Sequence, residues 1–371
     1  MPDDHDEPCF PWPAGSATGI GSMPGTNPAE AMRVVAGELP DFPHLAELPD
    51  RGPGADLTGR TAALLIEIPV EVTPRGWRLA ERPGRDLLRA RSMLSSDLDV
   101  MEEALDGFRG PFKIQLCGPW TLAATLELPR TLNVAIADPG AIADLTASLA
   151  EGAAAHVAEI AKRVPGAQLI VQLDEPALSA VAGGEVPTAS GLSRIAPVEA
   201  DVLRERLAQV IASTGKYTVV HSCSTAVPFG IIRAAGASAL SFDLSQLRRG
   251  EEDAVAEAAE AGMGLLTGVV PAFGSVPVPQ TTQARPGPAG RRVPTGPGDG
   301  SAEARQAAER VIRLWQRLGL PLDTCPEQAV ITPACGLAGA SPEQARAALT
   351  SCREAGSMLA ELIEETGEEP R

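Results

Sequence analysis

The chain has 371 residues, 44% of them hydrophobic, and a formal net charge of −17. This apolar fraction suffices for a large core, and barrels of repeated strand–helix units often reach this length as one domain. The charge excludes nucleic acid and anionic membranes as expected partners, because a phosphate backbone is bound by clustered Lys and Arg. No apolar run of about eighteen residues is present, so no membrane span is predicted.

The N-terminal segment, residues 1–13, is acidic and rich in proline. A signal peptide would instead have a basic start followed by an apolar run. We therefore expect a flexible leader and a cytoplasmic protein, followed by a single domain over residues 14–365.

Six cysteines are scattered along the chain without the dense spacing of a disulfide scaffold. In a cytosolic enzyme such cysteines are core residues, metal ligands or nucleophiles. They are Cys9, Cys117, Cys223, Cys325, Cys335 and Cys352.

Eight short apolar segments alternate with helical stretches. The expected strands are 18–21, 44–48, 112–117, 168–173, 217–221, 239–243, 264–269 and 329–332. Amphipathic spacing predicts helices at 141–163, 197–213, 251–261 and 301–318, and a last helix beginning at Ser341. Apolar strands alternating with helices predict an α/β protein with a parallel sheet. Eight such units favour closure into a (β/α)8 TIM barrel, with an open doubly wound sheet as the alternative.

Two segments interrupt this alternation. Residues 50–105 are too many for a simple crossover, so we expect extra helices or a hairpin over the barrel mouth. Residues 275–300 are rich in Pro and Gly and lack periodicity, which predicts a mobile loop after the seventh strand.

Polar or reactive residues end most of the predicted strands. In a barrel the active site lies at the carboxyl ends of the strands, so these side chains are expected to meet. In strand order they are Ser22, Glu47, Cys117, Asp174 with Glu175, His221 with Cys223, Asp243, Gly268 and Cys335.

The most informative of these residues are His221 and Cys223. Two residues apart on a strand, they point to the same side, and imidazole with thiolate is a good ligand pair for zinc. Taken alone, a half-buried His beside a core Cys explains the pair as well. Cys335, at the end of the eighth strand, favours a catalytic metal site built from separate strand ends. Asp243 is either a further ligand or a helix N-cap.

Two further segments offer groups for binding a substrate. Asp174 and Glu175 follow an apolar strand, where a carboxylate can orient a substrate amine or accept a proton, although Asp is also frequent as a cap. The segment from Thr18 to Gly25 lacks the Lys and the spacing of a P-loop. It is interpreted as a tight turn whose amides and Ser22 hydroxyl bind a carboxylate.

Five segments in order resemble the catalytic barrel of the cobalamin-independent methionine synthase family. They cover almost the whole chain, and the separate N-terminal barrel of the full-length members has no counterpart. The matching segments are 20–22 (Ile-Gly-Ser), 116–121 (Leu-Cys-Gly-Pro-Trp-Thr), 172–177 (Gln-Leu-Asp-Glu-Pro-Ala), 221–223 (His-Ser-Cys) and 333–337 (Pro-Ala-Cys-Gly-Leu).

The resemblance implies a zinc-dependent methyltransferase that methylates the thiol of homocysteine to form methionine. It implies the metal ligands His221, Cys223, Cys335 and Asp243, where Asp243 replaces a Glu that is usual in the family. Substrate binding is implied for Ile20, Ser22, Glu47 and Asp174, and Asp174 is also the candidate catalytic residue.

One departure from the family concerns the methyl donor. Phe273 takes the approximate place of a His that helps to protonate the departing folate, and an aromatic ring cannot deliver that proton. We therefore expect a methyl-corrinoid, free or protein-bound, to replace methyltetrahydrofolate as the donor.

Three alternatives remain open from the sequence. One is a zinc alkyltransferase of the same family that acts on another small thiol such as coenzyme M. Another is a uroporphyrinogen decarboxylase-like enzyme, which needs no metal. The last is a metal- or ligand-binding barrel without turnover.

Overall fold

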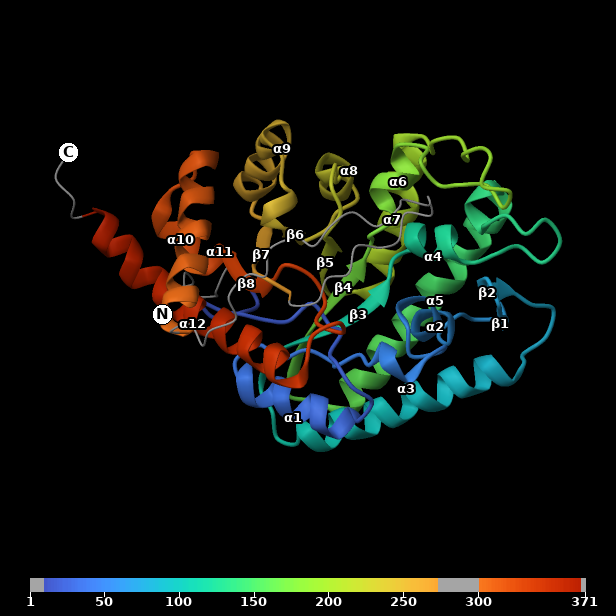
Figure 1. Cartoon of the computed structure of the whole chain (residues 1–371), viewed down its shortest axis with the longest axis horizontal. Helices are drawn as coiled ribbons and strands as arrows, with labels where there is room; N and C mark the ends of the chain where they lie inside the picture. The colour runs from blue at the N-terminus through green and yellow to red at the C-terminus, as the bar shows by residue number, and fades with distance from the viewer. Residues whose placement is uncertain (1–9, 273–299, 368–371) are drawn as a thin grey trace, which may run out of the picture.

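The computed structural model describes residues 10–272 and 300–367 (Figure 1). Its centre is a six-stranded parallel sheet whose strands follow one another in chain order. The strands are β3 (Gly110–Cys117), β4 (Ala167–Asp174), β5 (Tyr217–Ser222), β6 (Ala239–Asp243), β7 (Gly264–Val270) and β8 (Ala329–Pro333). Six of the eight predicted strands are thereby confirmed, and the chain is an α/β protein.

The first two predicted strands do not form as strands. Their segments instead make isolated parallel bridges, in which Ala17 pairs with Ile331 of β8 and Ser22 pairs with Glu47. A third parallel bridge joins His44 to Lys113 of β3. The prediction of eight full strands was wrong here: Gly19 and Gly21 interrupt the first segment, Pro43 and Pro49 flank the second, and each makes only isolated bridges.

Helices cover the outer face of the sheet, and the predicted long helices are confirmed within a few residues. Helix α12 begins with Pro342 directly after Ser341, and it packs against α10. The helices after β3 are α4 (Pro119–Thr125), α5 (Pro139–Arg163), α6 (Leu178–Ala182), α7 (Ala200–Thr214), α8 (Phe229–Ala234), α9 (Arg249–Glu260), α10 (Gly300–Leu318), α11 (Cys325–Gln328) and α12 (Pro342–Gly367). Short 3-10 turns are η2 (Ala135–Ala137), η3 (Leu244–Gln246) and η4 (Leu322–Thr324).

The N-terminal part of the chain supplies helices and a hairpin before the sheet begins. Helix α1 (Pro28–Glu38) and the long helix α3 (Arg85–Ala104) pack against each other. Between them lie η1 (Pro49–Arg51), α2 (Leu57–Ala62) and the antiparallel hairpin of β1 (Val70–Thr73) and β2 (Gly76–Leu79).

The two faces of the sheet belong to different core clusters, as β4 shows. Leu169, Val171 and Leu173 pack in the main core with the helices, whereas Ile170 belongs to a second, smaller cluster. Alternate residues of a strand point to opposite faces, so Gln172 and Asp174 lie on the same inner face as Ile170. The inner face is therefore apolar toward the strand starts and polar toward the strand ends.

The start of the described chain completes this inner cluster. Phe10 and Trp12 are buried, and the Trp12 indole stacks on Phe42 with ring centroids 5.8 Å apart. The indole Nε1 donates a hydrogen bond to the carbonyl of Glu327 at 3.0 Å. The expectation of a flexible leader over residues 1–13 is thus wrong for its last four residues, because two large aromatic side chains are buried there. Residues 1–9 lie outside the described residues.

Across the described ranges, no helix combines the length and apolar character needed to cross a membrane.

Candidate active site

Two cysteines from distant parts of the chain meet at the carboxyl ends of the strands. Cys223 follows β5, Cys335 follows β8, and their Sγ atoms are 3.2 Å apart. The hydrogen bond from Cys223 lowers the pKa of Cys335 to about 7, and the same contact raises the pKa of Cys223. One proton shared between two sulfurs leaves thiolate character on Cys335, and the thiolate is the form that binds metals.

His221 lies two residues before Cys223 and is buried. Its Nδ1 is 2.8 Å from the Ser241 hydroxyl on the neighbouring strand β6. Burial, together with the positive charge of Lys113, lowers the pKa of His221 to about 3. The imidazole is therefore neutral at physiological pH, and the Ser241 contact leaves Nε2 as the nitrogen suited to a metal.

Asp243 ends β6 and acts as the N-cap of η3. Its Oδ1 accepts a hydrogen bond from the Ser245 amide at 2.8 Å. The cap interpretation of the sequence is therefore confirmed. Asp243 also lies near enough to the thiols to raise the pKa of Cys335 slightly, against the larger effect of Cys223.

The predicted metal ligands are brought together only in part. Within residues 10–272 and 300–367, no three His, Cys, Asp or Glu side chains come close enough to share a metal ion. Cys223 and Cys335 are in contact, while the described contacts of His221 and Asp243 are with Ser241 and Ser245. In its chemistry, this set of two thiols, a neutral imidazole and a carboxylate fits zinc.

Asp174 is held at the end of β4 by its own strand. The Gln172 Nε2 donates to Asp174 Oδ1 at 2.7 Å and to the Ile20 carbonyl at 2.8 Å. Lys113 donates to the same Ile20 carbonyl from Nζ at 3.0 Å. Burial and the charge of Glu47 raise the pKa of Asp174, against the opposing effect of Lys113. Ile20 and Asp174 thus belong to one hydrogen-bonded network, in which Gln172 contacts both.

Ser22 lies against the loop that carries Cys335. Its carbonyl accepts a hydrogen bond from the Leu337 amide at 2.9 Å. A Cβ atom added to Gly336 would meet the Ser22 hydroxyl at 2.0 Å, so a larger residue at this position would force the Ser22 side chain into another rotamer. The predicted substrate-binding turn and a predicted metal ligand are therefore neighbours.

Glu47 is buried and forms an ion pair with Arg60, whose Nε is 3.4 Å from Oε1. Arg60 also pairs with the buried Asp97 at 2.6 Å, and Asp97 pairs with Arg51 at 2.7 Å. Burial raises the pKa of Glu47, with Arg60 and Lys113 acting in the opposite direction. Glu47 is thus held by a chain of alternating charges that runs from its carboxylate through Arg60 and Asp97 to Arg51.

Two of the predicted strand-end residues have structural roles. Glu175 is buried and accepts hydrogen bonds from the Trp120 amide at 2.9 Å and the Thr121 amide at 2.7 Å. It therefore satisfies the first amides of α4. Cys117 is buried, and its amide donates to the Thr61 hydroxyl at 2.8 Å.

Several polar residues of this inner face were missed by the sequence interpretation. Lys113 is fully buried, and burial lowers its pKa to about 7, against the effects of Asp174 and Glu47. His44 is also buried, packed against Gly19. The signal for Lys113 was available, because Lys113 and Gln115 alternate with large apolar residues within β3. Phe273, on which the donor expectation rests, lies outside the described residues, as does the predicted loop over residues 275–300 except for its last residue.

The chain shares its fold with a solved methionine synthase. "The structure of a B12-independent methionine synthase from Shewanella sp. W3-18-1 in complex with Selenomethionine" aligns with a TM-score of 0.52 and 12% identity, over 95% of this chain and 99% of that one. At this identity, the likeness concerns the fold alone. A search of curated proteins finds no match.

The sequence profile of one family, described as "Cobalamin-independent synthase, Catalytic domain", matches residues 15–285. This range is more than half of the chain and contains all the predicted site residues except Cys335. The family resemblance is thereby confirmed, with four of the five sequence segments inside the matched range and the fifth, 333–337, beyond it. The chain belongs to the catalytic-domain family of the cobalamin-independent methionine synthases, which are methyltransferases.

Proposed function

We propose that this protein is a zinc-dependent methyltransferase that moves a methyl group to the thiol of homocysteine and so forms methionine. The observation that carries the proposal is the 3.2 Å contact between Cys223 and Cys335, which come from strand ends far apart in the sequence. Two thiols at the polar end of a parallel sheet, with a neutral His221 two residues away, are the donors that a catalytic zinc site uses.

The proposal includes a closed ring of eight parallel segments. Residues 17–22 bridge to β8 and to residue 47, and residue 44 bridges to β3. We infer that these two segments occupy the places of the missing first and second strands of a TIM barrel. A closed ring would explain why Cys335, after the last strand, lies beside both Ser22 and Cys223.

His221, Cys223, Cys335 and Asp243 are the residues that would hold zinc. When bound, zinc would keep the substrate thiol deprotonated at neutral pH. Asp174 would accept a hydrogen bond from the amino group of the amino acid. Ser22, with the amides around it, would bind the carboxylate, and Glu47, whose backbone bridges to that of Ser22, would be a further substrate-binding residue.

Metal analysis tests the proposal. We expect about one zinc per purified chain and its loss in Cys335→Ala, because a thiolate ligand is removed. Cys352→Ala, which alters a buried cysteine of α12, is the matched control and should retain the metal. Zinc-free wild-type protein, or full zinc retention in Cys335→Ala, would contradict the proposed site.

Donor choice is tested by supplying homocysteine with either methylcobalamin or methyltetrahydrofolate and measuring methionine. We expect turnover with the corrinoid. Brisk turnover with the folate would refute this donor assignment, and methylation of coenzyme M in place of homocysteine would refute the substrate.

A further inference from the structure

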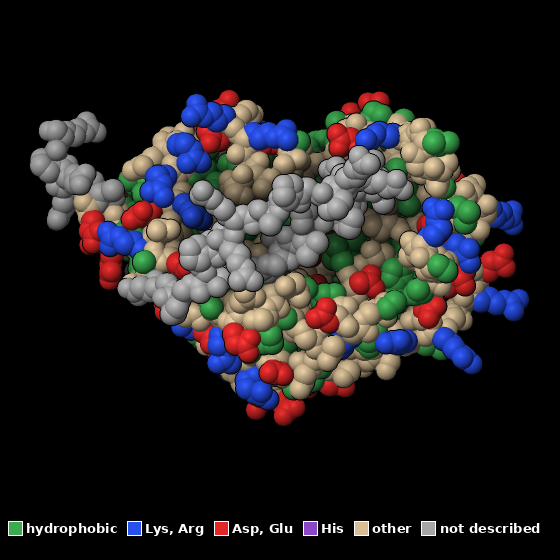
Figure 2. Space-filling view, in the orientation of Figure 1, with side chains coloured by type: hydrophobic (Ala, Val, Ile, Leu, Met, Phe, Trp, Pro, Cys, Tyr) green, Lys and Arg blue, Asp and Glu red, His purple; other side chains and the backbone are tan. Residues whose placement is uncertain are grey.

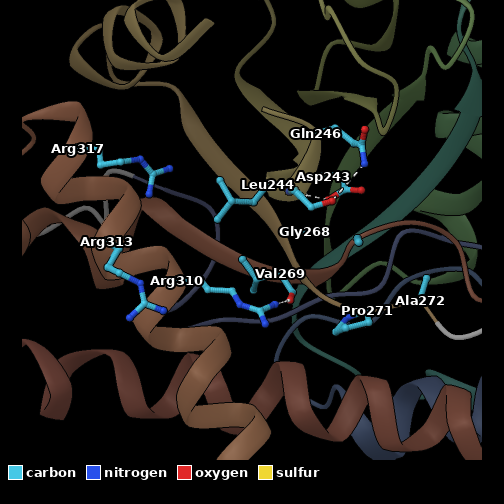
Figure 3. A pocket seen from close by; sticks show the side chains of 12 residues that line it. Asp243, Leu244, Gln246, Gly268, Val269, Pro271, Ala272, Arg310, Arg313 and Arg317 are labelled. Carbon is cyan, nitrogen blue, oxygen red and sulfur yellow. Dashed lines mark hydrogen bonds between the residues drawn. The ribbon is translucent and has the colours of Figure 1, made fainter. Parts of the chain in front are cut away.

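Beside the thiol pair lies a cavity of about 650 Å³ whose outer wall is one face of α10 (Figure 3). Its inner wall is formed by Asp243, Gly268 and Ala334. Ala334 directly precedes Cys335, and Gly268 pairs with Asp243 in the sheet. The cavity therefore opens next to the proposed site of methyl transfer.

The outer wall is strongly basic. Arg310, Arg313 and Arg317 all line the cavity, and their spacing of three and four residues places them on one side of the helix. Figure 3 shows their side chains extending from α10 toward the strand ends. Figure 2 shows several Lys and Arg side chains gathered over this part of the molecule. Asp243 is the one carboxylate among the described residues that line the cavity, while Glu252 and Glu309 contact Arg317 and Arg313 at its edge.

Contacts at the edge of the cavity hold these arginines in place. Arg310 donates from Nη1 to the Val269 carbonyl at 2.9 Å, and Arg317 donates from Nε to Glu252 at 2.9 Å. Arg313 pairs with Glu309 of its own helix at 3.4 Å. Each hydrogen bond uses one N–H of a guanidinium that carries five, and planar guanidinium groups bind carboxylates and phosphates well.

We infer that this cavity binds an anionic group, a carboxylate or a phosphate, of the methyl donor. The inference rests on the proposed function. It assumes that the methyl group of the donor lies at the thiols, while the anionic part of the same molecule reaches the arginines of α10. The homocysteine carboxylate is assigned to the Ser22 turn, and Ser22 does not line this cavity. The larger donor is therefore the molecule that extends into the basic cavity.

Calorimetric binding to the full-length protein tests the inference in two matched ligand pairs. Methylcobalamin carries a phosphodiester that methylcobinamide lacks, and methyltetrahydrofolate triglutamate carries more carboxylates than the monoglutamate. The variant is Arg313→Gln with Arg317→Gln. Arg310 is left intact because it supports the backbone of β7. The control is Arg305→Gln, an exposed arginine of α10 that pairs with Glu365 and does not line the cavity.

We expect the double variant to weaken binding of the more anionic member of one pair by about 5- to 10-fold, as the loss of two exposed charge contacts predicts. The less anionic member should change by less than about 2-fold, and the responding pair identifies the source of the anion. The effect should shrink at high salt. Equal weakening of both members, no weakening, an equal effect of Arg305→Gln or no donor binding to the wild type would each overturn the inference. Calorimetry measures binding and not turnover. If a donor binds as expected here but the methionine assay shows no methyl transfer, the proposed function is refuted and the anion-binding inference stands.

Discussion

The positions of single residues in the candidate site depend on contacts with segments that are distant in the sequence. Gly336 is an example, since in the structure the Ser22 hydroxyl lies where a Cβ at this position would be. Ser22 in turn holds the Leu337 amide, so the loop after β8 is attached to the first turn of the chain. The geometry of Cys335 therefore depends on residues more than three hundred positions away.

Gly336→Ala should raise the KM for the proposed substrate homocysteine several-fold and destabilise the protein by about 1 kcal/mol or less, because the added methyl group forces the Ser22 hydroxyl to rotate away. The matched control is Gly230→Ala in α8, where the added Cβ meets no atom within 4 Å. Steady-state kinetics and chemical denaturation measure the two effects. Equal behaviour of the two variants would show that the close approach of Gly336 and Ser22 is unimportant.

Lys113 should make stability depend on pH. Burial lowers its pKa in the folded protein to about 7, below the ordinary value of 10.5, so between these values the unfolded chain binds the extra proton. Stability from this group is complete above pH 10.5 and is lost as the pH falls toward 7. Between pH 7 and 9, the free energy of unfolding should rise by on the order of 1–2 kcal/mol more in wild type than in Lys113→Met.

Chemical denaturation at both pH values measures this difference. Lys216→Met, at an exposed position, is the control and should retain the wild-type pH dependence. A Lys113→Met protein with an unchanged pH dependence would rule out a shifted Lys113.

At the scale of elements, sequence periodicity predicted the six hydrogen-bonded strands and the long helices because both have regular apolar patterns. It failed for 18–21 and 44–48. These segments form only isolated bridges, to β8, to β3 and to each other, and a single bridge does not need a strand-like sequence around it. For the site, His221, Cys223 and Cys335 stand at strand ends and could be predicted. Lys113, His44 and Arg60 were missed because their roles come from contacts that only the folded chain creates.

Asp97 of α3 shows how such a contact supports an element. It is almost fully buried and pairs with Arg60 of α2 and Arg51 of η1. Asp97 therefore joins α3 to α2 and η1, and Arg60 links it to Glu47. Asp97→Ala should destabilise the protein by about 3–5 kcal/mol, because it leaves buried guanidinium groups without their partner. Asp99→Ala, on the same helix with a side chain 68% exposed, should cost less than about 1 kcal/mol. The midpoints of urea denaturation compare the two variants, and similar losses would contradict a special role for the buried pair.

At the scale of the whole molecule, aromatic residues near the start of the chain cover the inner face of the sheet close to the strand starts. Trp12 packs between Phe10 and Phe42, and a Cβ added to Gly264 of β7 would meet its indole at 2.6 Å. Trp12→Ala should therefore cost about 3–5 kcal/mol in unfolding free energy, as expected for a large buried aromatic side chain. Leu192→Ala, at a position 92% exposed, is the control and should have little effect. A Trp12→Ala protein as stable as this control would show that the inner cluster does not depend on the indole.

The pairing of Ala17 with Ile331 also sets an order of events during synthesis. Thr18 donates its amide to the Ile331 carbonyl, and Ile331 donates to Ser16, so the first segment finds its partner only after β8 has been translated. Until then, the nascent chain exposes the edge of β7 and an unclosed apolar interior, which are the surfaces that aggregate or recruit chaperones. Both sulfurs of the candidate site can meet only after β8 and Cys335 have left the ribosome, so this site is assembled later than the strands that precede β8.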